Sequence, residues 1–362
     1  MAMERLGLVG LANAGKSSLF NALTGGHAVV AAHPFSTVET TVGVAPLPDA
    51  RLDQLARLSH SAKVIHAGVE FVDIAGLVAG SASGEGMGNR FLAGIREVDA
   101  LVLVLRAFHD DAVTGTDDPL ESLETLELEL VLADVASLET QAEKRRKQAR
   151  LRKDATLAAE ADAIDEAMAV LQTGVPLFRS DLAAPVREQL RNSFLLTNKP
   201  VLAVVNVGED QLESVDELCA PVAAHLGSAG EAIGVCVQLE AEAAQLDPAE
   251  RVELLEGLGL GEGVVPRVAH AAFHLLGLRT FLTTGEKESR AWTFRAGALA
   301  PECAGVIHSD LQRGFIRAEV IHWDELVELG GWQHAKTAGK LRVEGKDYAV
   351  QDGDVLEIRF NV

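Results

Sequence analysis

Short apolar segments recur along much of the chain, and each is too brief to be a helix. They cover residues 6–9, 69–72, 100–105 and 201–205, and helix-like segments lie between them. Continuous apolar runs of this length are typical of strands buried on both faces of a parallel sheet. Strands that alternate with helices predict an α/β fold whose mostly parallel sheet is covered by helices and binds ligands beyond the carboxyl ends of its strands.

A different pattern, with alternating steps of three and four residues, occupies residues 126–195. Two apolar stripes follow it, and their members are Leu128, Val131, Val135, Leu138 and Ala142 in the first and Leu157, Ala161, Ile164, Met168 and Leu171 in the second. Each stripe traces one side of a helix. A basic segment at 144–153 separates them, so we predict an antiparallel helical hairpin inserted into the sheet-containing domain.

The pattern changes again from about residue 278, where short β-like segments lead to a turn at 352–354 and a strand candidate at 355–360. This pattern predicts a small α+β domain. We therefore expect a first domain formed by residues 1–125 and 196–277, an inserted helical domain at 126–195, and a C-terminal domain at 278–362.

Composition limits the class of protein. The chain has 362 residues, of which 48% are hydrophobic and 23% charged, so it can form sizeable cores. Its formal net charge of −21 disfavours a general coating of polyanions. The three cysteines, Cys219, Cys236 and Cys303, show no C-x-x-C spacing, and no apolar run approaches the about 18 residues of a membrane span. We expect a reducing, cytoplasmic location and no membrane partner.

Residues 10–17 read Gly-Leu-Ala-Asn-Ala-Gly-Lys-Ser and match the phosphate-binding loop G-x-x-x-x-G-K-[ST] between a predicted strand and a helix. In this motif backbone N–H groups surround the phosphates, the lysine reaches the β- and γ-phosphates, and the hydroxyl binds Mg²⁺. The predicted nucleotide-binding residues here are Asn13, Ala14, Gly15, Lys16, Ser17 and Ser18.

Two further segments complete the predicted phosphate and metal site. Asp73, which follows the strand candidate 69–72, can hold Mg²⁺ through water, and the N–H of Gly76 can meet the γ-phosphate. Thr37 lies between the two motifs, where a mobile segment brings a hydroxyl to Mg²⁺, although an ordinary loop is the alternative. We predict Ser17, Thr37 and Asp73 as metal ligands and Lys16, Thr37 and Gly76 as catalytic residues.

The base-recognition segment is Asn206-Val-Gly-Glu209, directly after the strand candidate 201–205. Guanine-specific proteins have N-K-x-D here, and the aspartate accepts hydrogen bonds from guanine. In this chain Val207 replaces the lysine and Glu209 the aspartate, so the bidentate contact and the cover over the ring are both altered. Adenine is therefore the better candidate, and Asn206, Val207 and Glu209 are the predicted base-binding residues.

These motifs together resemble the YchF family, the Obg-like ATPases among the P-loop NTPases. The most specific stretches are residues 8–17, 71–78, 84–89 and 345–355, and the resemblance extends from end to end. It implies a P-loop G domain, an inserted α-helical coiled-coil domain and a C-terminal TGS domain of ubiquitin-like β-grasp form. It further implies hydrolysis of ATP, with GTP used less well, and association with ribosomes. In that family the N-x-x-E element reads adenine, with Phe108 as an apolar neighbour of the base.

The chain departs from the family in three places. Leu77 stands where many related GTPases have the glutamine that orients water, a replacement for which this family is known. The loop at 106–119 lacks the family's candidate catalytic histidine, because Thr114 aligns there and His109 is in another register, as expected of a solvated loop residue. Ser36 replaces a cysteine linked to redox control. Asn13 adds the hypothesis of a K⁺ ion beside the phosphates, as in related P-loop proteins.

The basic segment near the predicted hairpin tip contrasts with the acidic background. Its charged members are Lys144, Arg145, Arg146, Lys147, Arg150, Arg152 and Lys153. From charge alone, a solvated helix balanced by Glu139, Glu143 and Asp154 is a sufficient explanation. The family's association with ribosomes favours instead a contact with ribosomal RNA through this tip. No dimerisation motif is evident, so we expect a monomer.

Three functions remain open from the sequence. The first is a Mg²⁺-dependent ATPase whose hydrolysis changes its association with the ribosome. The second is an Obg-type assembly GTPase that uses the same site. The third is a nucleotide-gated regulator whose hydrolysis is vestigial.

Overall fold

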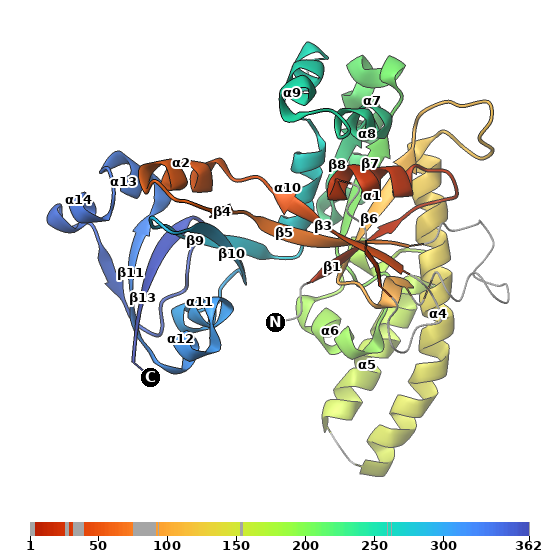
Figure 1. Ribbon diagram of the computed structural model, residues 1–362. Helices are drawn as coiled ribbons and strands as arrows, with labels where there is room; N and C mark the ends of the chain where they lie inside the picture. Colours follow the sequence, from red (N-terminus) through yellow and green to blue (C-terminus); the bar gives the residue numbers. More distant parts are fainter. Residues whose placement is uncertain are drawn as a thin grey trace. The chain divides into compact units, whose positions relative to one another are not determined.

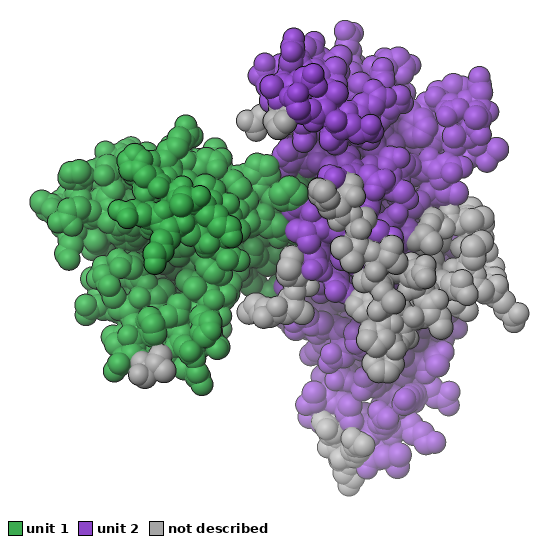
Figure 2. Space-filling model, in the orientation of Figure 1, with its two compact units in different colours: residues 1–3, 46–69, 269–362 green, residues 4–45, 70–268 purple. Residues whose placement is uncertain are grey.

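The computed structural model describes residues 4–25, 29–31, 40–74, 92, 94–152, 155–258, 260–261 and 263–361. The chain forms two compact units, shown in different colours in Figure 2. Unit 1 contains Met1–Met3, Pro46–Val69 and Ala269–Val362, and unit 2 contains Glu4–Ala45 and Glu70–Val268. In the described part of the chain, no helix is both long and apolar enough to cross a membrane.

The sheet of the nucleotide-binding fold has the strand order β2-β3-β5-β1-β6-β7-β8 in the described residues. Strands β1, β5, β6, β7 and β8 run parallel, and β2 pairs antiparallel with β3 at the edge. Their bounds are β1 Arg5–Val9, β2 Val29–Ala31, β3 Thr40–Leu47, β5 Ala67–Asp73, β6 Ala100–Arg106, β7 Val201–Asn206 and β8 Ala232–Val235. The predicted α/β fold with a mostly parallel sheet is confirmed.

Every residue of β6 and β7 is buried, which explains their unbroken apolar sequences. Further helices and short 3₁₀ turns lie between residues 16 and 275. They are α1 Lys16–Thr24, α6 Ala184–Gln189, α7 Val215–Leu226, α8 Val237–Ala243, α9 Pro248–Gly257, α10 Val265–Leu275, η2 Leu177–Arg179, η3 Arg191–Ser193, η4 Glu209–Ser214 and η5 Gly227–Ala229. Both α6 and η2 pack against α5 (Ala155–Leu171), and most of α10 belongs to unit 1. Helix α1, which follows β1, packs against α8, which follows β8. Helix α7 packs against β8. Helices that follow different strands therefore contact one another.

Two long helices, α4 (Pro119–Arg152) and α5 (Ala155–Leu171), pack against each other as a hairpin (Figure 1). Their shared core includes Val131, Leu138 and Ile164, which belong to the two predicted apolar stripes. Leu128 does not join it, because its side chain is 53% exposed. At that level α4 turns a different face inward, and its buried residues, including Leu126, pack with the core of the sheet.

The basic segment is not a connection between the two helices. Residues 144–152 lie between the two apolar stripes, as expected, but they form the last turns of α4 itself. These residues have good helix propensity, and the helix therefore continues through them.

The second sheet has the order β12-β11-β13-β9-β10-β4 in the described residues. Strand β9 (Leu278–Thr283) pairs antiparallel with β10 (Ser289–Arg295) and parallel with β13 (Asp354–Phe360), which pairs antiparallel with β11 (Phe315–His322). Strand β12 is Arg342–Glu344, and the helices are α11 Ala300–Ile307, α12 Ser309–Arg313, α13 Trp323–Glu328 and α14 Trp332–Thr337. A central parallel pair between antiparallel neighbours, with α11 packed on β10 and β11, is the arrangement of a β-grasp sheet. The TGS assignment itself stays a prediction.

Residues 46–69, which the sequence analysis placed in the first domain, pack with this C-terminal sheet. Strand β4 (Val64–Ile65) pairs parallel with β10, and helix α2 (Ala50–Leu58) packs against β10 and α13. Sequence periodicity gave no signal for this, because the partners lie more than two hundred positions away.

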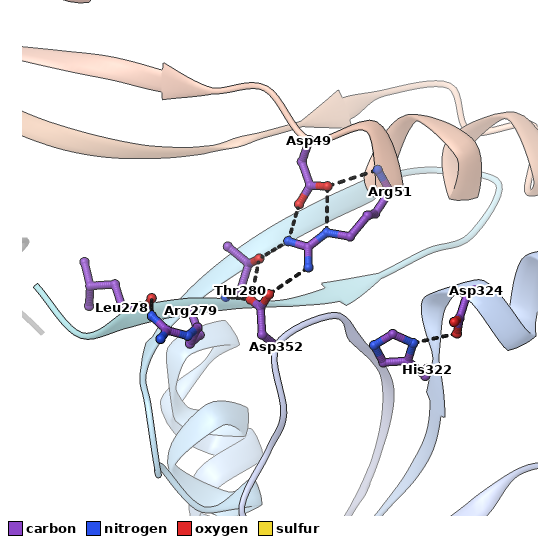
Figure 3. A network of polar contacts seen from close by, with 8 residues as sticks. All are labelled: Asp49, Arg51, Leu278, Arg279, Thr280, His322, Asp324 and Asp352. Atoms are coloured by element: carbon purple, nitrogen blue, oxygen red, sulfur yellow. Dashed lines mark hydrogen bonds and ion pairs between the residues drawn. The ribbon is translucent and has the colours of Figure 1, made fainter. Parts of the chain in front are cut away.

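A polar network fixes the start of α2 to this unit (Figure 3). Asp49 caps the helix by accepting from the N–H of Arg51 at 3.0 Å, and it also receives the Arg51 guanidinium through Nε at 2.9 Å and Nη2 at 2.8 Å. The Nη1 group of Arg51 reaches Asp352 at 2.8 Å, and Nη2 reaches Thr280 at 3.0 Å. One cation thus joins two carboxylates that are far apart in sequence.

Candidate nucleotide site

The phosphate-binding loop connects β1 to α1. Asn13 and Gly15 adopt left-handed backbone conformations, with φ of 62° and 93°. A Cβ atom at Gly10 would lie 2.5 Å from the carbonyl oxygen of Val104, so no side chain fits there. Among the described residues no side chain caps the start of α1, which leaves its first N–H groups available to an anion.

Lys16 is a buried cation, with only 7% of its surface exposed. Its Nζ donates to the carbonyl oxygen of Leu11 at 2.9 Å. Burial lowers the pKa of Lys16, and the charge of the nearby Asp73 carboxylate partly offsets this effect. A phosphate anion in the loop would give this cation a much stronger partner than a neutral carbonyl does.

Ser17 and Asp73 are brought together across the sheet. The hydroxyl of Ser17 donates to the carboxylate of Asp73 at 2.7 Å, although the two residues belong to separate motifs. Hydroxyl and carboxylate oxygens are hard ligands of the kind that Mg²⁺ prefers. This pair therefore fits a Mg²⁺ ion. The other predicted phosphate and metal residues, Thr37 and Gly76, lie outside the described residues, as do Ser36 and Leu77.

The opposite end of the site is formed where three parallel strands end in register. Arg106 pairs with Asn206, and Asn206 pairs with Val235 on the next strand. Because these positions share one edge of the sheet, the loops that follow them lie next to one another, beside the phosphate-binding loop.

Asn206 connects this edge to the phosphate-binding loop. Its Nδ2 donates to the carbonyl oxygen of Ala14 at 3.1 Å, and its Oδ1 accepts from the N–H of Val237 at 3.2 Å. The side chain is buried, and both ends of its amide have protein partners. A Cβ atom at Gly15 would come within 2.2 Å of Nδ2, so glycine is needed there for contact as well as for backbone conformation. Asn206 thus stabilises the site through hydrogen bonds to the phosphate-binding loop and to the start of α8.

Val207 and Glu209 differ in their surroundings. Val207 is buried, and its N–H donates to the carbonyl oxygen of Val235 at 3.0 Å. Glu209 is exposed at the start of η4. Burial, and in addition the charge of Glu209, raises the pKa of the Cys236 thiol, which places the carboxylate near the start of α8. Of the predicted base-binding residues, Glu209 is the one whose polar side chain is exposed at this edge.

Gln211 is a support that the sequence analysis missed. Its Oε1 accepts from the N–H of Gly208 at 2.8 Å, and its Nε2 donates to the carbonyl oxygen of Ala107 at 3.0 Å. It therefore ties the loop that carries Glu209 to the loop after β6. Its position three residues after Gly208, at the start of a helical turn, is the spacing of a capping box and is the signal that could have identified it.

His109 lies at the surface of the loop after β6, as expected from the sequence. Its side chain is 73% exposed, and its ring nitrogens contact Asp117 at 2.9 Å and Asp111 at 3.2 Å. The contact with Asp117 and then that with Asp111 raise the pKa of His109. Both nitrogens are engaged by carboxylates of the same loop.

The basic end of α4 is partly neutralised across the hairpin. Arg145 pairs with Glu160 of α5 at 3.1 Å, and Arg146 pairs with Asp165 of the same helix. Lys144 and Lys147 are exposed and form no ion pair within the described residues. Arg150 and Arg152 belong to the last turns of α4, and Lys153 lies outside the described residues.

Comparison with known families gives matches to two parts of the chain. Residues 5–127 match the family model MMR_HSR1, described as a 50S ribosome-binding GTPase, and residues 278–361 match the model YchF-GTPase_C, described as a protein of unknown function (DUF933). The chain is similar over nearly its whole length to proteins named ribosome-binding ATPase YchF. Identity is 43% with the Bacillus subtilis protein, over 98% of this chain and 99% of that one, and 44% with the Haemophilus influenzae protein, over 99% of each.

A solved structure, that of the Schizosaccharomyces pombe YchF GTPase, superimposes with a TM-score of 0.84. The alignment covers 98% of this chain and 97% of that one, at 28% sequence identity. The similarity in structure therefore extends over both units as well as over the phosphate-binding motif.

Proposed function

The chain belongs to the YchF family, and from this premise we propose that it is a Mg²⁺-dependent ATPase that binds ribosomes according to its nucleotide state. The observation that carries the proposal is the Asn206 amide, which joins the phosphate-binding loop to the base-recognition edge. One side chain thereby holds both ends of a nucleotide site in a fixed relation. The names of the relatives support ATP and the ribosome as ligands.

Phosphate chemistry at this site depends on positioning and charge. Lys16 would neutralise the β- and γ-phosphates, and the N–H groups of Ala14 to Ser18 would surround them, with Gly76 predicted from its motif as a further donor. Mg²⁺ would be held by Ser17 and Thr37, and by Asp73 through water, and when bound it stabilises the charge that develops between the β- and γ-phosphates. Asn13, with its left-handed backbone beside the loop, is the proposed neighbour of a K⁺ ion.

Adenine selection is assigned to Glu209 and to the backbone of Val207, with Phe108 against the ring. The Glu209 carboxylate can accept from the exocyclic amine of adenine, which guanine lacks at that position. ATP is therefore the preferred nucleotide and GTP the weaker one.

The central experiment measures binding and hydrolysis of ATP and GTP with and without ribosomes, in K⁺ and in Na⁺, with Lys16→Ala as the blank. Preference for ATP with turnover that ribosomes stimulate supports the proposal. Preference for GTP would favour the Obg-type GTPase, and tight ATP binding without turnover would favour the regulator. Equal rates in K⁺ and Na⁺ would argue against the K⁺ site.

Ribosomal contact is assigned to the exposed lysines at the end of α4, through ribosomal RNA, with the protein acting as a monomer. Lys144 and Lys147 supply charge that α5 does not neutralise, and such contacts weaken with salt. A double variant, Lys144→Ala with Lys147→Ala, should cosediment less with ribosomes. The control, Lys63→Ala with Lys287→Ala, removes the same charge from exposed sites of unit 1 and should cosediment like the unmodified protein. If both double variants bind like the unmodified protein, the tip assignment fails.

A further inference from the structure

Arg106 is a buried cation at the end of β6, outside the phosphate and base motifs. Only 4% of its surface is exposed. Its guanidinium donates to three carbonyl oxygens of the loop that follows: to Phe108 from Nε at 3.0 Å, to Val113 from Nη1 at 3.2 Å and to Asp110 from Nη2 at 3.5 Å. In the described part of the chain no carboxylate forms an ion pair with it. The loop is therefore folded around one side chain.

The charge of Arg106 acts on Asp117 of the same loop but forms no ion pair with it in the described residues. Burying a guanidinium without an ion pair is costly, and an apolar residue would fill a strand end at a lower cost. The planar fork of arginine offers something that an apolar residue cannot, since it satisfies several carbonyl groups at fixed angles. Carbonyl oxygens that point inward at a loop otherwise lose their hydrogen bonds. The charge at Arg106 therefore serves the conformation of the loop.

Phe108 is the residue whose place this conformation fixes. Its ring centroid lies 5.0 Å from the guanidinium carbon of Arg106, within the range of a cation–π contact. Its N–H donates to the carbonyl oxygen of Asn206 at 3.1 Å, and its carbonyl oxygen accepts from Arg106. Gly208 lies against it, because a Cβ atom there would be 3.6 Å from the Cβ of Phe108. Phe108 is thus fixed on both sides, beside the loop that carries Glu209.

We propose that Arg106 is a positioning residue for adenine: it holds Phe108 in the place where the ring packs against the base while Glu209 reads the edge of the base. This inference rests on the proposed ATP site and adds the determinant of its affinity. The base enters a preformed apolar contact and does not have to order the loop, so less entropy is lost on binding.

Arg106→Lys tests this proposal because it keeps the charge and removes the fork. Two ligands are compared by calorimetry: ATP, and inorganic tripolyphosphate, which occupies the phosphate loop and has no base. We expect the Kd for ATP to rise about tenfold, the Kd for tripolyphosphate to stay within about twofold, and the preference for ATP over GTP to fall. Arg191→Lys, at an exposed arginine paired with Glu188, is the matched control and should leave both affinities unchanged.

The outcomes separate the possibilities. Unchanged ATP affinity in Arg106→Lys overturns the proposal, and so does an equal loss for both ligands, since that result would mean that Arg106 supports the phosphate loop. Phe108→Ala should reproduce the selective loss, and the double variant should add little to it. If Arg106→Lys does not fold, the Kd values of Phe108→Ala for ATP and tripolyphosphate test the proposal instead. If the unmodified protein binds tripolyphosphate and does not bind ATP, the proposed function itself has failed.

Discussion

Replacing Arg51 by methionine should destabilise unit 1, because it removes the cation shared by Asp49 and Asp352 (Figure 3). Methionine retains most of the volume and the apolar part of the side chain. The change therefore tests the charge and the hydrogen bonds of the network, with little effect on packing.

The expected loss of stability depends on the hydrogen bonds that each carboxylate retains in the variant. Asp49 is 9% exposed and retains the backbone N–H of residue 51, while Asp352 is 36% exposed and retains the N–H of Thr280 at 2.9 Å. Loss of one partner from a fully buried pair costs about 3–5 kcal/mol. Here both carboxylates keep a donor and one can rehydrate, so we expect a loss of about 2–3 kcal/mol in the free energy of unfolding.

Tryptophan fluorescence during urea unfolding reports on this unit alone, since the three tryptophans, Trp292, Trp323 and Trp332, all belong to it. The effect should depend on pH. Burial tends to raise the pKa of Asp352, but the Thr280 amide and the Arg51 guanidinium lower it below its ordinary value. A lowered carboxyl pKa gives stability that is present above the unfolded value of about 3.9 and is lost as pH falls through the folded value. The difference between the two proteins should therefore shrink from pH 7 to about pH 3.

Arg313→Met is the control, because Arg313 forms an exposed pair with Asp310 in the same unit. It should change the stability by less than about 0.5 kcal/mol. If Arg51→Met costs no more than this control at pH 7, the network does not hold α2 to the sheet and the reasoning is wrong.

Three further predictions follow from the site and the hairpin. Asn206→Asp replaces the amide donor by a carboxylate oxygen that faces the carbonyl oxygen of Ala14, 3.1 Å away. The Kd for ATP, measured by calorimetry, should rise about tenfold or more. An unchanged Kd would contradict the supporting role of Asn206. Ser17→Ala removes the hydroxyl next to Asp73 and should raise the Mg²⁺ concentration needed for half-maximal turnover, with an unaltered Mg²⁺ dependence as the opposing result. Leu138 is fully buried in the hairpin core, so Leu138→Ala should lower the free energy of unfolding, followed by circular dichroism, by about 2–4 kcal/mol. Leu132 is 49% exposed, so Leu132→Ala should lower it far less. Similar losses in the two variants would contradict this packing.

Much of the fold was predictable because its signals are local. The apolar runs of β6 and β7 follow from burial on both faces of a parallel sheet, and the phosphate loop follows from a backbone conformation that its glycines permit. The order of the motifs along the chain also predicted which loops meet, because carboxyl ends of parallel strands share one edge. The hairpin helices followed from their three-and-four spacing.

Predictions were less complete where a residue's role depends on its distant neighbours. Leu128 fits the apolar stripe of α4 but is exposed, since the helix packs on the sheet at one level and on α5 at another. Asn206 was predicted to contact the base, and its position in the motif could not reveal that both ends of its amide have protein partners. Gln211 carries only the spacing of a capping box, and nothing local to Arg106 indicates that its guanidinium binds three carbonyl oxygens of the following loop.

What the sequence by itself determined is the buried parallel strands, the two hairpin helices and the chemistry of the phosphate and base motifs, because backbone conformation and periodic burial act over a few neighbouring residues. Only the tertiary structure decided which side chains support that chemistry and where residues 46–69 belong. Arg51 and Asp352 lie 301 positions apart and meet at 2.8 Å. Such a contact depends on how whole elements pack, and neither partner's local sequence contains that information.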